Sequence, residues 1–263
     1  MNQKESRIRE EHLLLSCAVF VFLVALAIRL AKLIVDPLLM RDAAQYLDLA
    51  EIWFDSGRYA DTFLFGNVIP PLPLFSIREM MRLGYSSDLC GRSLALFFGS
   101  AVPVLGFLAA FRIRHRIGMA LIMAGILAAH PSLVSYSIQP MRENYYMVSM
   151  GLLLIFAIDA WKRKSQMKWM LCGVMCAVAV FCRYEALEMM IILPVVMVMA
   201  KWKQHLSSHH LVMNLASFFL AIAVSTIVLL SITGYDASFL KKIIRYGGDI
   251  EFHNRPEMIV RPN

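Results

Sequence analysis

Two hydrophobic segments of this 263-residue chain each carry an arginine close to a glutamate near the point where the segment must turn. Arg142 and Glu143 form one pair, and Arg183 and Glu185 form the other. A guanidinium group matches a phosphate with two parallel hydrogen bonds and never loses its charge. Charged groups inside hydrophobic segments are costly and usually functional. The pairs are therefore candidate phosphate ligands, and the alternative is that each pair is an ion pair that closes its own hairpin.

The composition indicates that membrane-spanning helices position these residues. The chain is 59% hydrophobic and only 17% charged, with a mean hydropathy of +0.61, which excludes an ordinary soluble domain. A first span begins near Leu13 and continues into Arg29 without a small-residue cleavage site, so it is not a signal peptide. The further hydrophobic stretches are residues 90–111, 117–138, 141–160, 169–200 and 211–233.

Residues 169–200 are too long for one straight span. At about 1.5 Å per residue their helix would be roughly 48 Å long, against about 30 Å of hydrocarbon. Basic residues flank both ends, so the chain must return to the side from which it came. Two short spans hinged near Arg183 meet both conditions. The fold class is therefore an all-α polytopic transmembrane helix bundle of about seven spans.

The net charge of +7 reflects topology rather than a nucleic-acid partner. Lysine and arginine gather in short stretches, at residues 1–12, 112–116, 162–168 and 201–203. Such basic loops stay cytoplasmic, as does the N-terminus. The loop 36–88 and the tail 234–263 then lie outside, and both Arg/Glu turns meet on that outer face. We expect an integral protein of a bacterial plasma (inner) membrane with an extracytoplasmic active site.

The first outer loop carries an amphipathic pattern typical of a surface helix over residues 42–54, ended by Gly57. We expect this helix to lie on the membrane with its apolar face down and its acidic face in solvent. The prolines at 70–73 predict extended or turning chain before a further helix at 74–81, and a second surface helix is expected at 236–246. The apolar face comprises Ala43, Tyr46, Leu47, Ala50 and Trp53 with Phe54, and the acidic face comprises Asp48, Glu51 and Asp55.

Asp42 stands at the start of this helix and has two interpretations. With Gln45 it fits a capping box, in which the aspartate accepts from backbone N–H groups. It is also a carboxylate at the membrane surface that can take a proton from a hydroxyl group. Arg29 and Lys32, late in the first span, either extend to the interface or join the anion site.

Several short motifs together resemble polytopic glycosyltransferases of the C-type (GT-C) fold, the protein O-mannosyltransferase and lipid A aminoarabinose-transferase kind. The resemblance covers roughly residues 13–233. The motifs are Asp-Ala-Ala-Gln-Tyr-Leu-Asp-Leu-Ala (42–50), Ser-Gly-Arg-Tyr (56–59), Pro-Pro-Leu-Pro-Leu-Phe (70–75), Ser-Ile-Gln-Pro-Met-Arg-Glu (137–143) and Phe-Cys-Arg-Tyr-Glu-Ala-Leu (181–187).

This resemblance implies a seven-span module over residues 1–233, with an outer tail at 234–263. Its members move a sugar from a polyprenyl-phosphate carrier to an acceptor, which can be a lipid, a glycan or a protein. Some relatives have an Asp-Glu pair at the catalytic position, where Ala43 follows the aspartate here. The site implied is Asp42 as general base; Arg142, Arg183, Arg29 and Lys32 as phosphate ligands; and Glu143, Glu185 and Tyr46 as supporting residues.

We expect no cofactor, although a divalent metal is not ruled out by the residues. Larger members continue beyond their seventh span. The chain is then a minimal enzyme, a truncated product, or an enzyme that takes its acceptor site from a partner subunit. The other functions considered are a transporter or flippase of a lipid-linked or anionic substrate, and a catalytically silent scaffold.

Overall fold

The computed structural model describes residues 3–59, 70–204 and 207–234, and within these ranges it contains helices and no strand. This confirms the all-α helix bundle. The predicted tail helix at 236–246 lies outside the described residues. The helices are α1 Gln3–Val35, α2 Arg41–Ser56, α3 Pro71–Met81, α4 Ser87–Arg114, α5 Ile117–Ala129, α6 Pro131–Ser137, α7 Arg142–Arg163, α8 Gln166–Cys182, the 3₁₀ helix η2 Tyr184–Glu188, α9 Met189–Gln204 and α10 Ser208–Thr233.

Four described helices are long and apolar enough to cross a membrane, and the bent pair α5 and α6 makes a fifth span if it is counted as one. The pair, which covers the hydrophobic stretch 117–138, bends by 62° at His130 and Pro131. Helices α8 and α9 have 17 and 16 residues and fall short of that length. The count of seven spans therefore stays a prediction. The four long helices are α1, α4, α7 and α10.

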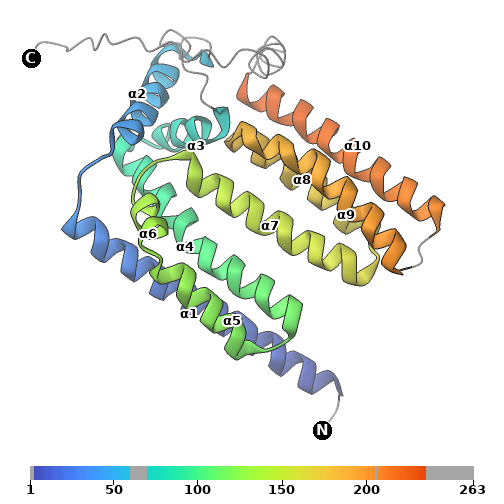
Figure 1. The fold of residues 1–263 in the computed structure, drawn as a ribbon. Helices are drawn as coiled ribbons and strands as arrows, with labels where there is room; N and C mark the ends of the chain where they lie inside the picture. Colours follow the sequence, from blue (N-terminus) through green and yellow to red (C-terminus); the bar gives the residue numbers. More distant parts are fainter. Residues whose placement is uncertain (1–2, 60–69, 205–206, 235–263) are drawn as a thin grey trace, which may run out of the picture.

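The four long helices and α8 pack side by side in the order α1, α4, α7, α8, α10, with α5 against α1 and α4 (Figure 1). The predicted hinge is present, because α8 ends at Cys182 and Arg183 has an extended backbone before η2 and α9 begin. Helices α2 and α3 lie across one end of the bundle, and the N-terminus lies at the other end (Figure 1).

Helix α2 matches the predicted pattern, and it ends at Gly57, whose φ of 70° suits a residue without a side chain. Its acidic face is exposed as predicted. Its apolar face, however, does not lie on the membrane. Tyr46, Leu47 and Trp53 belong to a core cluster with Leu74 of α3 and Cys90 of α4. The stripe predicted the buried face correctly except at Phe54, which is exposed, and the face packs against protein instead of lipid.

The prediction that the prolines at 70–73 form no helix is wrong. Helix α3 begins at Pro71, and Pro73 lies in its first turn. The first N–H groups of a helix have no partner within the helix, so proline loses nothing there, and its fixed φ favours the helical backbone.

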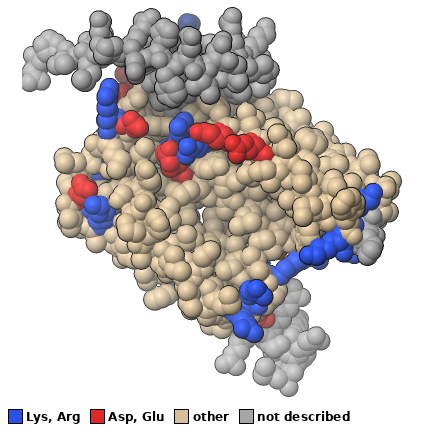
Figure 2. Space-filling model, in the orientation of Figure 1, with Lys and Arg blue, Asp and Glu red and all other residues tan. Residues whose placement is uncertain are grey.

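The two ends of the bundle differ in charge. Figure 2 shows lysine and arginine side chains along the lower edge, which holds the α4–α5, α7–α8 and α9–α10 connections, whereas acidic and basic side chains mix near the upper end. This asymmetry is the one that the basic stretches of the sequence predict.

Candidate active site

The turns before α7 and after α8 bring both Arg/Glu pairs to the same end of the bundle. Glu143 lies between the two arginines: its Oε1 is 3.5 Å from Nε of Arg142 and 3.8 Å from a terminal nitrogen of Arg183. The Nε of Arg183 is also 3.0 Å from Glu185. We call these four residues the Arg/Glu cluster. The prediction that the two turns meet is confirmed.

The cluster is held firmly but is not closed to ligands. Arg183 packs with its guanidinium 5.7 Å from the ring centroid of Tyr146, and the side chains of Arg142 and Arg183 stay 29% and 33% exposed. Burial alone would raise the pKa of Glu185, but a backbone hydrogen bond, a hydrogen bond from Arg183 and the charge of Arg142 together lower it. The cluster thus keeps Glu185 ionised and leaves both arginines in reach of an anion.

Helix α2 brings two further predicted residues to this cluster. Tyr46 is buried, and burial raises the pKa of its hydroxyl, while the charge of Arg142 lowers it and those of Glu143 and Asp42 raise it further. The Tyr46 hydroxyl therefore lies close enough to Arg142, Glu143 and Asp42 for their charges to act on it. Asp42, one helical turn earlier, is exposed. The charges of Asp42 and Arg142 both act on the Tyr46 hydroxyl, so the exposed carboxylate at the start of α2 lies in the neighbourhood of the cluster.

The capping interpretation of Asp42 is wrong. Helix α2 begins at Arg41, its N-cap is Met40, and no side chain caps it. Asp42 lies in the first turn, where its negative charge interacts favourably with the helix dipole. Its carboxylate is therefore not engaged as an N-cap.

Gln139, to which the sequence assigned no role, fixes α2 to the turn before α7. Its Oε1 accepts from the backbone N–H of Met40 at 3.0 Å, and its Nε2 donates to the carbonyl of Leu38 at 2.9 Å. Both partners precede α2 directly, and Gln139 itself precedes Arg142 by three residues. The side chain is 2% exposed. A single buried amide thus sets the position of Asp42 relative to Arg142.

The turn that carries Gln139 is itself fixed by Asn144. The buried Nδ2 of Asn144 donates to the carbonyls of Tyr136 and Gln139, both at 3.0 Å. A Cβ added at Gly91 of α4 would lie 2.7 Å from side-chain atoms of both Leu47 and Pro140. Helix α2, helix α4 and this turn therefore meet without spare room. The only sequence signal was a pair of amide residues around a proline turn between apolar segments.

The remaining predicted phosphate ligands lie on α1. Arg29 is fully buried, which excludes the interpretation that it extends to the interface. It donates to the carbonyl of Ala25 at 3.0 Å, and in the described part of the chain its Nε and one terminal nitrogen have no hydrogen-bond partner. Lys32 forms an ion pair with Asp36 at 2.9 Å. A role for either residue in binding an anion stays a prediction.

Chemically, the arrangement offers fixed cations for an anion and a carboxylate that can accept a proton. Among the described residues, no group of three histidine, cysteine, aspartate or glutamate side chains is placed to hold a metal ion. The cations of the Arg/Glu cluster are both guanidinium groups.

A sequence model of the family described as dolichyl-phosphate-mannose-protein mannosyltransferase matches residues 69–229, more than half of the chain. The matched region includes Gln139 and the whole Arg/Glu cluster, whereas Asp42 and Tyr46 precede it. A search of curated proteins finds no significant match.

Proposed function

Because this chain belongs to the dolichyl-phosphate-mannose-protein mannosyltransferase family, it is a membrane glycosyltransferase of that general type, and we propose that its Arg/Glu cluster binds the phosphate of a polyprenyl-phosphate sugar. The single observation that carries this proposal is the shared carboxylate. Arg142 and Arg183 come from different hairpins, and Glu143 holds both at 3.5 and 3.8 Å. Two guanidinium groups held together are suited to a phosphate that gains negative charge as it departs.

In the proposed reaction, the oxygen of an acceptor hydroxyl bonds to the anomeric carbon of the sugar while the bond from that carbon to the carrier phosphate breaks. The electron pair of the broken bond leaves with the polyprenyl phosphate, next to Arg142 and Arg183. The hydroxyl proton passes to Asp42, which acts as general base. The transition state resembles an oxocarbenium ion, so the fixed positive charges must face the leaving phosphate.

Glu185 is the partner that an incoming phosphate displaces. Its side chain is 51% exposed, whereas that of Glu143 is 19% exposed. A phosphate can therefore replace the Glu185 carboxylate on Arg183 while Glu143 keeps both arginines in place. The displaced carboxylate can then accept hydrogen bonds from hydroxyl groups of the sugar.

The proposal includes an orientation. The basic end of the bundle faces the cytoplasm with the N-terminus, and the Arg/Glu cluster faces the outer side of a bacterial plasma membrane. The carrier tail then stays in the bilayer, and only its head group reaches α2. A monophosphate carrier has less charge to neutralise than a pyrophosphate carrier, so we propose that transfer needs no metal. Loss of activity on adding a chelator would count against that.

The test compares two aspartates of one exposed helix in lipid-reconstituted protein. The native chain, Asp42→Asn and the matched control Asp48→Asn are incubated with radiolabelled polyprenyl-phosphate sugars and a cell-envelope extract as acceptor. Removing a general base costs about 100-fold or more in rate. We expect that loss for Asp42→Asn and native transfer for Asp48→Asn, whose side chain is also exposed on α2.

Equal transfer by the native chain and both variants would support the transferase activity but contradict the role of Asp42 as general base. No release of label from any sugar, by any of the three proteins, would favour a scaffold that keeps the fold without the activity.

A further inference from the structure

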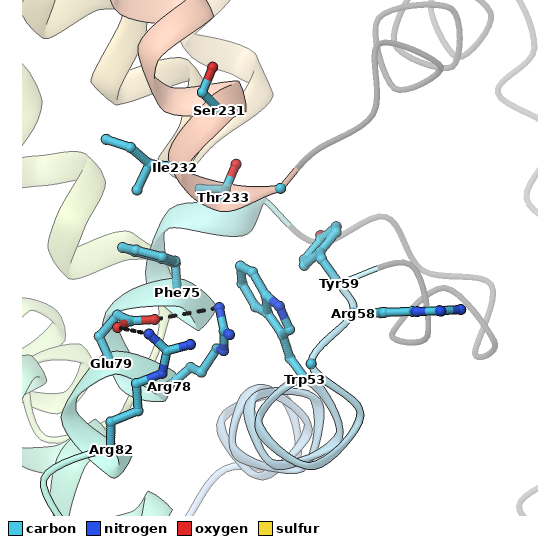
Figure 3. Close-up of a pocket in the computed structure, with 12 residues that line it drawn as sticks. Trp53, Arg58, Tyr59, Phe75, Arg78, Glu79, Arg82, Ser231, Ile232 and Thr233 are labelled. Atoms are coloured by element: carbon cyan, nitrogen blue, oxygen red, sulfur yellow. Dashed lines mark hydrogen bonds and ion pairs between the residues drawn. The ribbon is translucent and has the colours of Figure 1, made fainter.

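A cavity of about 500 Å³ lies between the end of α2, helix α3 and the end of α10 (Figure 3). It is separate from the Arg/Glu cluster, none of whose residues lines it. Its aromatic part is formed by side chains in edge or tilted contact: the Trp53 ring centroid is 4.8 Å from that of Tyr59 and 5.9 Å from that of Phe75. Sites of this size bind a small group of a ligand.

One wall of the cavity carries more positive than negative charge. Glu79 is 2.8 Å from Arg82 and 3.4 Å from Arg78, so two guanidinium groups share one carboxylate. Arg58 points away from this pair in Figure 3 and adds nothing to it. The guanidinium of Arg78 stacks 5.0 Å from the Trp53 centroid, and within the described residues its Nε has no hydrogen-bond partner. The side chain of Arg82 is 54% exposed and available.

Two guanidinium groups and one carboxylate leave this wall with a net positive charge. Burial lowers the pKa of Arg78, the neighbouring charge of Arg82 lowers it further, and Glu79 opposes both. An added anion would act in the same direction as Glu79.

The opposite wall offers hydrogen-bond acceptors. The hydroxyl groups of Ser231 and Thr233 donate to carbonyls of their own helix, at Ile227 and Leu229, which leaves their oxygen atoms free to accept. Helix α10 ends here at Gly234, and the last carbonyls of a helix are acceptors too. A ligand that carries both hydroxyl groups and a negative charge suits such a cavity.

The cavity and the Arg/Glu cluster are connected through α2. Trp53 follows Asp42 by eleven residues, which is roughly 16 Å along a helix. Tyr46 lies between them, and its hydroxyl feels the charges of both Arg142 and Tyr59. A molecule that reaches both sites must therefore be extended, as a chain of several sugar units is.

We propose that this cavity binds a sugar bearing a carboxylate or a phosphate within the acceptor saccharide, several units away from the hydroxyl that receives the transferred sugar. This inference rests on the proposed transferase function, because only a transferase has an acceptor. The binding site itself rests on Arg78, Glu79 and Arg82.

The test measures equilibrium binding of three probes to the full chain in detergent, without any donor. The probes are a neutral tetrasaccharide of glucose, the same tetrasaccharide with one glucuronate in place of glucose, and the same tetrasaccharide with one 6-phosphate. We expect the anionic probes to bind about tenfold more tightly than the neutral one, as suits a charge-assisted hydrogen bond. Whichever anionic probe binds more tightly identifies the acidic group.

Two substitutions on the same wall must then act in opposite directions. Arg82→Gln removes an exposed cation and should remove most of the tenfold preference, whereas Glu79→Gln removes the competing carboxylate and should increase it. Arg114→Gln, an exposed arginine at the other end of the bundle, is the control and should change nothing. Because Arg82 is exposed, a folding defect is not expected to obscure the result.

Equal binding of all three probes, absence of binding by the native chain, or an unchanged preference in Arg82→Gln would each overturn the inference. Since no donor is present, these outcomes do not depend on catalysis. A chain that binds the anionic probes but never releases sugar from a carrier would contradict the proposed function and leave this site standing.

Discussion

Both ends of the bundle pair arginine with an acidic residue, yet the two arrangements differ in what they leave available. At the basic end, Arg112 of α4 forms an ion pair with Asp159 of α7, and Lys168 of α8 lies 3.9 Å from the same carboxylate. At the other end, Arg142 and Arg183 share Glu143. The first arrangement joins three helices around a carboxylate that is 7% exposed.

The difference lies in the exposure of the carboxylates and in the neighbouring elements, because Asp159 is 7% exposed whereas Glu143 and Glu185 are 19% and 51% exposed. Lys162 donates to carbonyls at the end of α4, so the basic end uses its cations to close its own connections. In the Arg/Glu cluster the arginines are about a third exposed, as Arg112 is, but Glu185 is half exposed, and the charges of Arg142 and of Asp42 on α2 both act on Tyr46. The same residue types thus fasten helices at one end, and at the other we propose that they present cations to a ligand. A charged cluster can act as a site only if a ligand and a second reacting group can both reach it, which a structural ion pair does not require.

The largest effect is expected from Glu143→Gln, which keeps the shape of the side chain but removes its charge. Both arginines would lose their common partner, and misplacement of catalytic groups by about 1 Å costs on the order of 100-fold in rate. We expect transfer to fall by about that factor with little change in thermal unfolding. Normal sugar transfer by this variant would contradict the proposal and leave Glu143 with a structural role only, like that of Asp159.

A smaller effect on transfer is expected from Gln139→Leu. The substitution removes both hydrogen bonds to the segment before α2, at Leu38 and Met40, so the start of α2 is no longer fixed to the turn before Arg142. We expect about a tenfold lower kcat with the KM for donor nearly unchanged, since the two proposed phosphate ligands, Arg142 and Arg183, do not lie on α2. The control is Gln166→Leu, which removes an exposed hydrogen bond to Ser217 at the basic end. Equal effects of the two variants would contradict a positioning role.

The counterpart at the basic end is Asp159→Asn, which should act on stability alone. Removing the buried carboxylate leaves Arg112 and Lys168 without their common partner, which we expect to cost about 2 kcal/mol in the free energy of unfolding. Denaturant unfolding in detergent measures this, and transfer per folded molecule should stay native. A large loss of activity in protein that remains folded would break the contrast between the two ends.

The meeting of the two Arg/Glu turns could be predicted because the topology of a membrane protein determines where basic residues lie in its sequence. Basic residues on both sides of 117–161 and of 169–200 require an even number of crossings, which forces both turns to one side. The hinge at Arg183 followed from the length of the stretch 169–200 together with the basic residues at both of its ends. These arguments need no knowledge of side-chain contacts.

The positioning of the site could not be predicted in the same way. Gln139 acts through backbone groups about 100 residues earlier, and no local pattern reports such a hydrogen bond. The stripe of α2 identified its buried face but not whether protein or lipid covers it. No pattern in the sequence marks the wall formed by Arg78, Glu79 and Arg82, because the cavity exists only where α10 ends beside α3.

The most direct test of the central claim is a double-mutant cycle on phosphate binding. Dissociation constants for a polyprenyl phosphate are measured with native protein, Arg142→Gln, Arg183→Gln and the double variant. If both arginines hold one phosphate, each single variant should bind about tenfold more weakly, and the two losses should be coupled by about 1 kcal/mol or more. Native affinity in both single variants, or losses that simply add, would contradict a shared phosphate site.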